Sequence, residues 1–483
     1  MSEKKSLSKS GAYYLVYNVL NMAFPFMTGL YVARTLLPSN IGEVVAAQNL
    51  ATYFCILAFL GIPTYGLREI AKTRNSREER NKVFSELYVI NLISTVFFTI
   101  VYFVLIGLVP VYRQNFILYA IVGLSIALNS FNITWLYEGL EEFRFISVRN
   151  IVFKSLSFIC LVLFVKEQDD YLTYAAITII GTAGNNIVNM LCFSKFATLS
   201  FHNLNLRKHL KSILYLVMVN LAIEIYSLMD ITMMNFMCGK ENIAFYKYGV
   251  AVYKILLQVV NTFTMVLVPR ITYYYKQNMT EEFDYLVSKG LRLIILTSVP
   301  MIVGIYFTSD FLIQQMYGSQ YAGSAIILKM CSILLFISPI GYLLGSRMLL
   351  VSGHEDKMVI CVGLGALANL IGNALLIPKM QEFGAAIASI ISGFIVMFVY
   401  VAYGRNYFRL VNVGKSTIKV IISAFLMGIF LLICSKININ GWVKVSVQIV
   451  GAIAIYITLL LVGKEDTTKQ YANMFLSKIK RKK

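Results

Sequence analysis

Charged residues are scarce in this sequence. Of its 483 residues, 14% are Asp, Glu, Lys or Arg and 58% are hydrophobic, whereas a soluble protein of this length would carry roughly 25% charged residues. The composition therefore argues against an ordinary soluble enzyme or binding module.

Patterns that bind metals, cofactors or nucleotides are also missing. The seven cysteines are scattered without a Cys-x-x-Cys pair, which argues against a disulfide framework and a metal site. His202 and His209 fall in one predicted basic loop and His354 in another, so no ligand cluster is expected. No glycine-rich phosphate loop occurs, which argues against direct ATP hydrolysis. We expect no metal and no cofactor.

Long apolar runs dominate the chain instead. A helix needs about 20 apolar residues to cross a bilayer, and such runs recur from residue 11 to residue 463. The sequence predicts an all-α polytopic membrane protein. The first ten residues are polar, and we expect no cleavable signal peptide. The predicted spans are fourteen: 11–33, 42–65, 83–106, 116–137, 146–165, 171–193, 213–237, 243–268, 291–309, 322–345, 357–378, 382–404, 417–435 and 442–463.

The positive charges orient these spans. Residues in the first four positions of a span, such as Arg149, are counted with the connection that precedes it. Of the 43 Lys and Arg residues, 32 then lie in the connections and termini on one side, 7 on the other side and 4 deeper within spans. Since cytoplasmic loops carry the excess of Lys and Arg, both termini are predicted to be cytoplasmic. Basic loops also suit the anionic lipids of the inner leaflet. The net charge of +19 therefore does not call for a nucleic-acid partner.

Weak similarity between the ends of two spans suggests an internal repeat. The second span ends "LGIPTYGLREIAK" (60–72) and the eighth ends "LVPRITYYYK" (267–276), each with a proline followed by basic residues. The sequence predicts an N-terminal lobe (1–212), a C-terminal lobe (213–412), two accessory helices (413–463) and a basic cytoplasmic tail (464–483). Parallel repeats of this kind place a transport site between the lobes near the midplane.

The eighth span carries charges where apolar residues would be expected. Lys247, Lys254, Gln258 and Asn261 are spaced so that they cover an arc of about 60° on one helix face. A lysine at the bilayer centre costs at least ~2.5–3.5 kcal/mol. This polar stripe is therefore predicted to line an aqueous, cationic cavity that binds an anionic cargo.

Other spans contribute polar residues. Glu224 and Asp230 in the seventh span could hold those lysines in a structural ion pair, or carry a coupling proton. Asn18 and Asn21 in the first span could line the cavity, or join helices by hydrogen bonds. Lys154 in the fifth span could supply a cation of the other lobe, or extend towards the cytoplasm.

Several segments of the sequence resemble one family of membrane transporters, the Wzx-type flippases. These polysaccharide transporters belong to the superfamily that includes the lipid II flippase and the multidrug MATE antiporters. The similar segments are "YGLREIAKTRN" (65–75), "WLYEGLEEFRFISVRNIVFK" (135–154), "MDITMM" followed by "AFYKYGVAVYKI" (229–255), "VLVPRITYY" (266–274) and "ANLIGNALLIPKMQEFGAAIASIIS" (368–392).

The resemblance implies two six-helix lobes with two further helices around a cationic cavity. It implies a flippase, not an enzyme. Such a protein moves undecaprenyl-diphosphate-linked oligosaccharide repeat units from the inner to the outer leaflet of the bacterial cytoplasmic membrane, for assembly of capsule, O-antigen or a related polysaccharide. A polysaccharide polymerase and chain-length machinery are candidate partners.

The resemblance also implies roles for particular residues. The family's acid of the seventh span and cation of the eighth fall on Asp230 and Lys254. Residues that would act in gating at the cytoplasmic ends of the second and fourth spans fall on Arg68, Glu69, Trp135 and Glu138.

Two other functions fit an apolar chain of this length. A MATE-like ion-coupled antiporter for small organic compounds would have an acidic cavity, but the first span has no acid and the eighth has two lysines. A membrane-bound glycan polymerase or ligase would need a long external loop carrying catalytic residues, and the predicted external connections are short.

Overall fold

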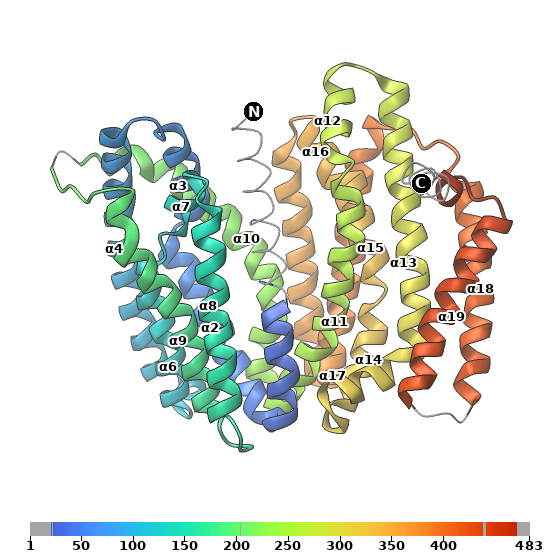
Figure 1. Cartoon of the computed structure of the whole chain (residues 1–483), viewed down its shortest axis with the longest axis horizontal. Helices are drawn as coiled ribbons and strands as arrows, with labels where there is room; N and C mark the ends of the chain where they lie inside the picture. Colours follow the sequence, from blue (N-terminus) through green and yellow to red (C-terminus); the bar gives the residue numbers. More distant parts are fainter. Residues whose placement is uncertain (1–20, 22, 203, 438–440, 471–483) are drawn as a thin grey trace, which may run out of the picture. The chain divides into compact units, whose positions relative to one another are not determined.

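The computed structural model describes residues 21, 23–202, 204–437 and 441–470, and helices make up all the regular structure of this part of the chain (Figure 1). Eleven of its helices are long and apolar enough to cross a membrane. The predicted all-α, polytopic fold class is therefore confirmed. The predicted site residue Asn18 lies outside the described residues.

The chain divides into two compact units, unit 1 (Met1–Ala244) and unit 2 (Phe245–Lys483). This division falls within a helix and not at 212/213, so the predicted lobe limits stay a prediction. After a helix over 23–35, unit 1 contains α2 (Pro38–Phe59), α3 (Ile62–Lys72), α4 (Arg77–Leu108), α5 (Pro110–Arg113), α6 (Phe116–Leu128), η1 (Asn129–Phe131), α7 (Thr134–Gly139), α8 (Phe143–Phe164), α9 (Tyr171–Cys192), η2 (Phe193–Lys195) and α10 (Arg207–Met237).

Unit 2 contains the remaining predicted spans. Its long helix α17 bends at Gln381, whose φ is 50°, and covers two of them. The elements are α11 (Lys240–Met265, beginning in unit 1), α12 (Val268–Lys276), α13 (Thr280–Tyr317), η3 (Ser319–Tyr321), α14 (Ala322–Cys331), α15 (Leu334–Gly341), η4 (Tyr342–Ser346), α16 (Arg347–Val351), α17 (Glu355–Gly404), η5 (Arg405–Tyr407), α18 (Val413–Lys436) and α19 (Gly441–Val462).

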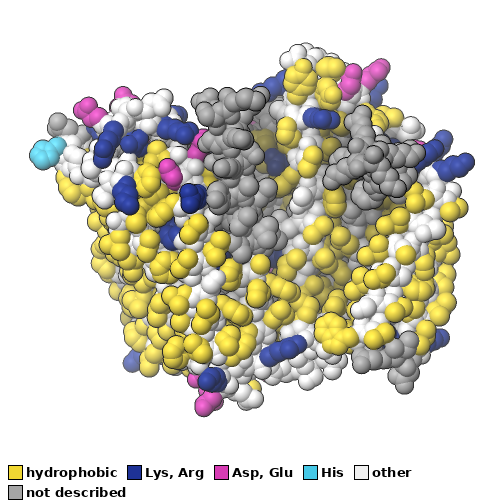
Figure 2. Space-filling model, in the orientation of Figure 1, with side chains coloured by type: hydrophobic (Ala, Val, Ile, Leu, Met, Phe, Trp, Pro, Cys, Tyr) yellow, Lys and Arg dark blue, Asp and Glu magenta, His cyan; other side chains and the backbone are white. Residues whose placement is uncertain are grey.

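Apolar side chains face outward along the long helices. On α4, Ile93, Phe97, Ile100 and Val104 recur every three or four residues and are 54–61% exposed. Figure 2 shows hydrophobic side chains covering the middle of each unit, with Lys, Arg, Asp and Glu mainly towards the helix ends. This distribution is typical of helices in contact with lipid, where backbone groups must be paired within each helix.

The two similar segments, 60–72 and 267–276, each contain or adjoin a helix break. In unit 1, Leu60 and Gly61 adopt left-handed backbone angles between α2 and α3, and Pro63 lies in the first turn of α3. In unit 2, α11 ends at Met265 and α12 starts with Val268 and Pro269. Proline is tolerated at a helix start because no N–H partner is lost there.

Each unit also fastens an extended segment to the start of one long helix. In unit 1, Asn81 and Ser85 of α4 accept the backbone N–H groups of Thr198 and Ser200 at 2.9 and 2.8 Å. In unit 2, Asp284 and Ser288 of α13 accept those of Arg409 and Val411 at 2.8 and 2.9 Å. The acceptors are four residues apart and the donors two residues apart in both cases, so the two units share this arrangement.

Two local interpretations of the sequence are corrected. His209 does not lie in a loop: α10 begins at Arg207, and His209 is 1% exposed. Arg149 is not in a cytoplasmic connection but within α8, where it is buried and donates to Asn185 Oδ1 at 2.6 Å. In both cases a polar partner within the unit compensates for burial, which hydropathy does not take into account.

Candidate functional site

The predicted polar stripe is present on α11. Lys254 and Gln258 are exposed and Asn261 is half-buried, on a helix whose other residues are mostly apolar. Among the described residues of unit 2, Lys254 forms no hydrogen bond or ion pair. An exposed ammonium group in the middle of a membrane helix needs water or an anion beside it, because hydrocarbon would not solvate it.

The two lysines of the stripe have different surroundings. Lys247 is half-buried, and its ammonium lies 5.3 Å from the centre of the Tyr248 ring. Tyr248 is itself buried against Tyr317, with ring centres 4.3 Å apart. Aromatic packing thus holds Lys247 in place by a cation–π contact, whereas Lys254 is available to a ligand.

The opposite face of α11 borders an apolar pocket of about 780 Å³ within unit 2. From α11, Leu256, Val259 and Phe263 line it, and the remaining walls come from α13, α18, α19 and Thr468 beyond α19. Because successive residues are turned by about 100°, these three side chains point away from Lys254 and Gln258, and the pocket lies across the helix from the stripe. The same helix therefore presents a cationic stripe and an apolar wall.

The predicted acids lie on α10 in unit 1. Asp230 is buried, 6% exposed, and has a polar partner; Glu224 is half-buried. Near Asp230, the Thr232 hydroxyl accepts a hydrogen bond from Asn49 Nδ2 at 2.7 Å and lies 3.1 Å from the Tyr53 hydroxyl. These contacts join α10 to α2 around the carboxylates.

A second polar cluster in unit 1 brings together predicted and unpredicted residues. Asn21 Oδ1 accepts a hydrogen bond from Lys154 Nζ at 2.6 Å and another from Asn150 Nδ2 at 2.9 Å. Asn21 and Lys154, predicted separately, therefore belong to one site. Lys154 is half-buried. Its partner in this contact is an amide oxygen, which carries no negative charge to neutralise the ammonium group.

The residues predicted for gating lie on α3 and α7. Glu69 pairs with Lys72 at 2.6 Å, and Arg68 is exposed. Trp135 is 2% exposed and packs so closely on Gly66 that a Cβ there would be 2.6 Å from its ring. Glu138 is half-buried. The short helices α3 and α7 thus pack tightly together.

Comparison with known proteins establishes the family. Residues 7–275 match the family model described as polysaccharide biosynthesis protein. The chain belongs to the polysaccharide biosynthesis protein family. The resemblance to Wzx-type transporters found in the sequence is thereby confirmed.

Two relatives of this polysaccharide biosynthesis protein cover most of its length. A candidate O-antigen transporter of Escherichia coli (strain K12) is 22% identical over 413 residues, 84% of this chain and 98% of the relative. The capsular polysaccharide biosynthesis protein CapF of Staphylococcus aureus is 23% identical over 411 residues, 83% of this chain and 100% of CapF.

A solved structure shares the fold of this family member. The lipid II flippase MurJ in an inward closed conformation superimposes with a TM-score of 0.72 at 16% identity, covering 93% of this chain and 98% of MurJ. The predicted lipid II flippase-like fold is therefore confirmed.

Sequence reasoning missed two polar residues of this polysaccharide biosynthesis protein that have clear partners. Asn150 joins the Asn21 and Lys154 cluster, and its position one turn before Lys154 in an apolar run was the available signal. Glu86 of α4 is 0% exposed and pairs with His209 at 2.9 Å. A carboxylate inside the apolar run of α4 requires such a partner.

Proposed function

We propose that this protein is a flippase for undecaprenyl-diphosphate-linked oligosaccharide repeat units. It carries them from the inner to the outer leaflet of the bacterial cytoplasmic membrane by alternating access, for the assembly of capsule, O-antigen or a related polysaccharide. The observation that carries this proposal is the exposed ammonium of Lys254 on a membrane helix whose opposite face borders an apolar pocket.

The diphosphate binds at the stripe of α11. A phosphate group entering an apolar environment needs charge-assisted hydrogen bonds, and Lys254 supplies one with a side chain that is exposed. Gln258 and Asn261 add amide groups along the same face. Lys247, held at the Tyr248 ring, contributes positive potential to the stripe.

The polyprenyl tail occupies the pocket between α11, α13, α18 and α19. This pocket is lined almost entirely by apolar side chains such as Val259, Phe263, Met301 and Ile453. Burying hydrocarbon there is favourable by roughly 25 cal/mol per Å². Because the pocket and the cationic stripe lie on opposite faces of α11, the bound lipid passes around this helix, with its tail on one side and its diphosphate on the other.

Unit 1 supplies sugar contacts and the coupling group. The amides of Asn21 and Asn150 and the ammonium of Lys154 form a polar cluster, with Asn18 of the same span as a further amide, and such groups suit hydroxyl-rich glycans. Asp230 and Glu224 are the candidates for binding a coupling proton or cation, and removal of product by polymerisation is the alternative driving force. Arg68, Glu69, Trp135 and Glu138 act in cytoplasmic gating.

The surroundings of the flippase follow from its charge pattern. Both termini lie in the cytoplasm, and the basic connections bind anionic lipids of the inner leaflet. A polysaccharide polymerase and chain-length machinery would receive the flipped unit. The competing function, a MATE-like antiporter for organic cations, is disfavoured by the ammonium groups of α11, which would repel such a cargo.

The test replaces the ammonium group of Lys254. Lys254→Ala is expected to abolish surface polysaccharide and to accumulate lipid-linked repeat units on the cytoplasmic side, whereas Lys254→Arg, which keeps the charge, should retain most transport. Protein abundance in the membrane is measured for both variants. Normal surface polymer in Lys254→Ala would remove Lys254 from the mechanism and contradict the proposed binding of the diphosphate.

A further inference from the structure

A buried carboxylate organises the start of α10 in unit 1. Glu86 of α4 is 0% exposed. Its Oε2 accepts from His209 Nε2 at 2.9 Å and from Lys208 Nζ at 2.7 Å, and its Oε1 accepts the backbone N–H of Asn205 at 2.9 Å. Both carboxylate oxygens are thus used, as a buried charge requires.

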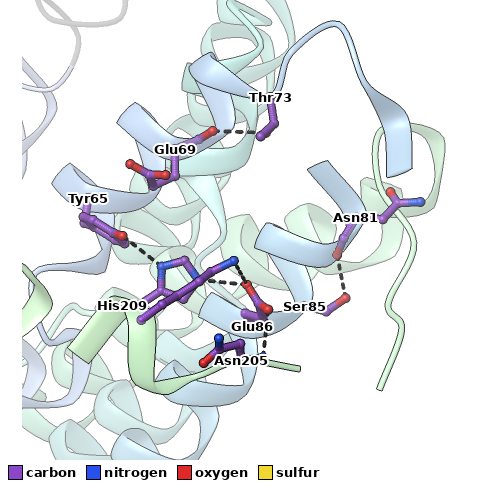
Figure 3. Close-up of polar contacts among 9 residues, drawn as sticks. Tyr65, Glu69, Thr73, Asn81, Ser85, Glu86, Asn205 and His209 are labelled. Carbon is purple, nitrogen blue, oxygen red and sulfur yellow. Dashed lines mark hydrogen bonds and ion pairs between the residues drawn. The ribbon is translucent and has the colours of Figure 1, made fainter. Parts of the chain in front are cut away.

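His209 extends this contact to a third helix. Its Nδ1 lies 2.9 Å from the Tyr65 hydroxyl of α3, so the imidazole ring connects α3 with Glu86 of α4. Figure 3 shows His209 between Tyr65 and Glu86, with Asn205 beside the carboxylate. One side chain of α10 therefore joins the helix that carries Arg68 and Glu69 to the helix that carries Glu86.

The connection that precedes α10 is fastened along its length, and we call residues 196–206, without residue 203, the strap. Arg80 donates to the carbonyl of Phe196 at 2.9 Å. The next bonds join Asn81 to Thr198 and Ser85 to Ser200, and Glu86 ends the series at Asn205. All four anchors come from one short stretch of α4, residues 80–86.

We propose that Glu86 and His209 are positioning residues that keep the strap, α3 and the start of α10 fixed to α4 throughout transport. The connection between the two predicted lobes then acts as a rigid clamp and not as a hinge. The cytoplasmic residues Arg68 and Glu69 move together with the beginning of the helix that bears Asp230. The part of this proposal that concerns transport rests on the proposed flippase function.

Unit 2 has the same anchors, one of them the buried carboxylate of Asp284, but has no acid at the position of Glu86. Asp284 and Ser288 hold Arg409 and Val411 as described above, but the residue after Ser288, at the position of Glu86, is Lys289, which donates to Gln470 Oε1 at 2.9 Å. The clamp of Glu86 and His209 is thus an addition to a shared arrangement, placed where the chain continues from one predicted lobe into the next.

The experiment compares two substitutions of His209 by hydrogen–deuterium exchange and by transport. His209→Gln keeps a donor for Glu86 and an acceptor for Tyr65, whereas His209→Leu has neither. In His209→Leu, exchange in the strap is expected to become about tenfold faster or more, and transport of lipid-linked repeat units should fall about tenfold. His209→Gln should stay close to the wild type in both measurements.

A matched control comes from unit 2. His354 Nδ1 lies 3.1 Å from the Tyr407 hydroxyl, so His354→Leu breaks a similar pair elsewhere and should leave strap exchange unchanged. If His209→Leu does not fold, Tyr65→Phe removes the hydroxyl alone and should speed exchange in α3 but not at Thr198 and Ser200.

Three results would overturn the proposal. They are wild-type exchange of the strap in His209→Leu, or of α3 in Tyr65→Phe; equal damage by His209→Gln and His209→Leu; and faster exchange with unchanged transport. A wild-type protein that moves no lipid-linked glycan would instead contradict the proposed function, while the exchange data would still decide whether the clamp exists.

Discussion

The starts of α4 and α13 anchor extended segments with the same spacing of residues but different chemistry. Asn81 and Ser85 hold the backbone of Thr198 and Ser200, while Asp284 and Ser288 hold that of Arg409 and Val411. A side-chain oxygen that accepts a backbone N–H satisfies a group that burial would otherwise leave costly. The two units therefore solve the same backbone problem at the same place.

The difference lies in the following residue. Glu86 is buried and binds His209, Lys208 and Asn205, whereas Lys289 is half-buried and binds Gln470. A buried carboxylate with several partners is costly to disrupt, while a partly exposed polar contact contributes little. Unit 1 therefore has a firmer attachment at this point than unit 2.

The largest expected effect concerns close helix approaches in the two units. A Cβ on Gly42 of α2 would fall on the backbone carbonyl of Lys240, and one on Gly249 of α11 would lie 2.7 Å from Ile327 Cβ. Overpacking costs about 1–3 kcal/mol, occasionally more. The loss of stability in Gly42→Ala is expected to exceed this range, because the backbone must move. The loss in Gly249→Ala is expected to fall within it.

The two tryptophans allow each unit to be followed separately. Trp135 belongs to unit 1 and Trp442 to unit 2, so apparent melting temperatures in detergent can be recorded in Trp442→Phe and Trp135→Phe backgrounds. Gly107→Ala, with open space around the added methyl, serves as the control. If Gly42→Ala melted like Gly107→Ala, the close approach in unit 1 would be refuted.

A smaller effect is expected at the shared anchors. Ser85→Ala and Ser288→Ala each remove one acceptor from a backbone N–H, and each should cost about 1 kcal/mol. Equal losses, measured as shifts of the melting temperature, would support the equivalence of the two anchors. Ser435→Ala, at an exposed position, should change little. A loss of stability in only one of the two variants would contradict the equivalence of the anchors.

The smallest effect concerns two carboxylates outside the spans that accept hydrogen bonds. Glu465 in unit 2 is buried, which by itself raises its pKa, but hydrogen bonds from Ser416 and Thr468 outweigh burial and hold the pKa below the ordinary 4.5. Asp170 in unit 1 is half-buried, and hydrogen bonds from the backbone N–H groups of Glu167 and Lys166 lower its pKa.

Both carboxylates therefore contribute stability above their unfolded-state pKa and lose it as the pH falls through the lower folded-state value. For this reason, the melting temperature recorded through Trp442 should change little between pH 7 and pH 5 and should fall in more acidic buffer. Ser416→Ala should move that drop to higher pH. An unchanged acid profile in Ser416→Ala would contradict the role of this hydrogen bond.

Local features of the fold could be predicted from the sequence. Spans follow from apolar length, and the breaks before Pro63 and Pro269 follow from proline geometry. The stripe of Lys254, Gln258 and Asn261 follows from helical winding, because all three residues lie on one helix. The role of that stripe in transport stays a prediction.

Contacts between distant segments could not be predicted in this way. Glu86 and His209 are separated by 123 positions, and Asn150 meets Asn21 across 129. Hydropathy assigned His209 to a loop because its pairing with a buried acid was unknown. The winding of a single helix likewise does not show which neighbouring helix will form a hydrogen bond with an amide side chain.

The two faces of α11 have a consequence for selectivity. In the proposed mechanism, a cargo that joins a hydrocarbon chain to a diphosphate reaches around the helix to both faces, and once one half is bound the second half is present at high effective concentration. A free sugar nucleotide or a plain polyprenol engages a single face and gains no such advantage. Discrimination against these abundant fragments then arises from the linkage of two modest affinities, without either face being highly selective.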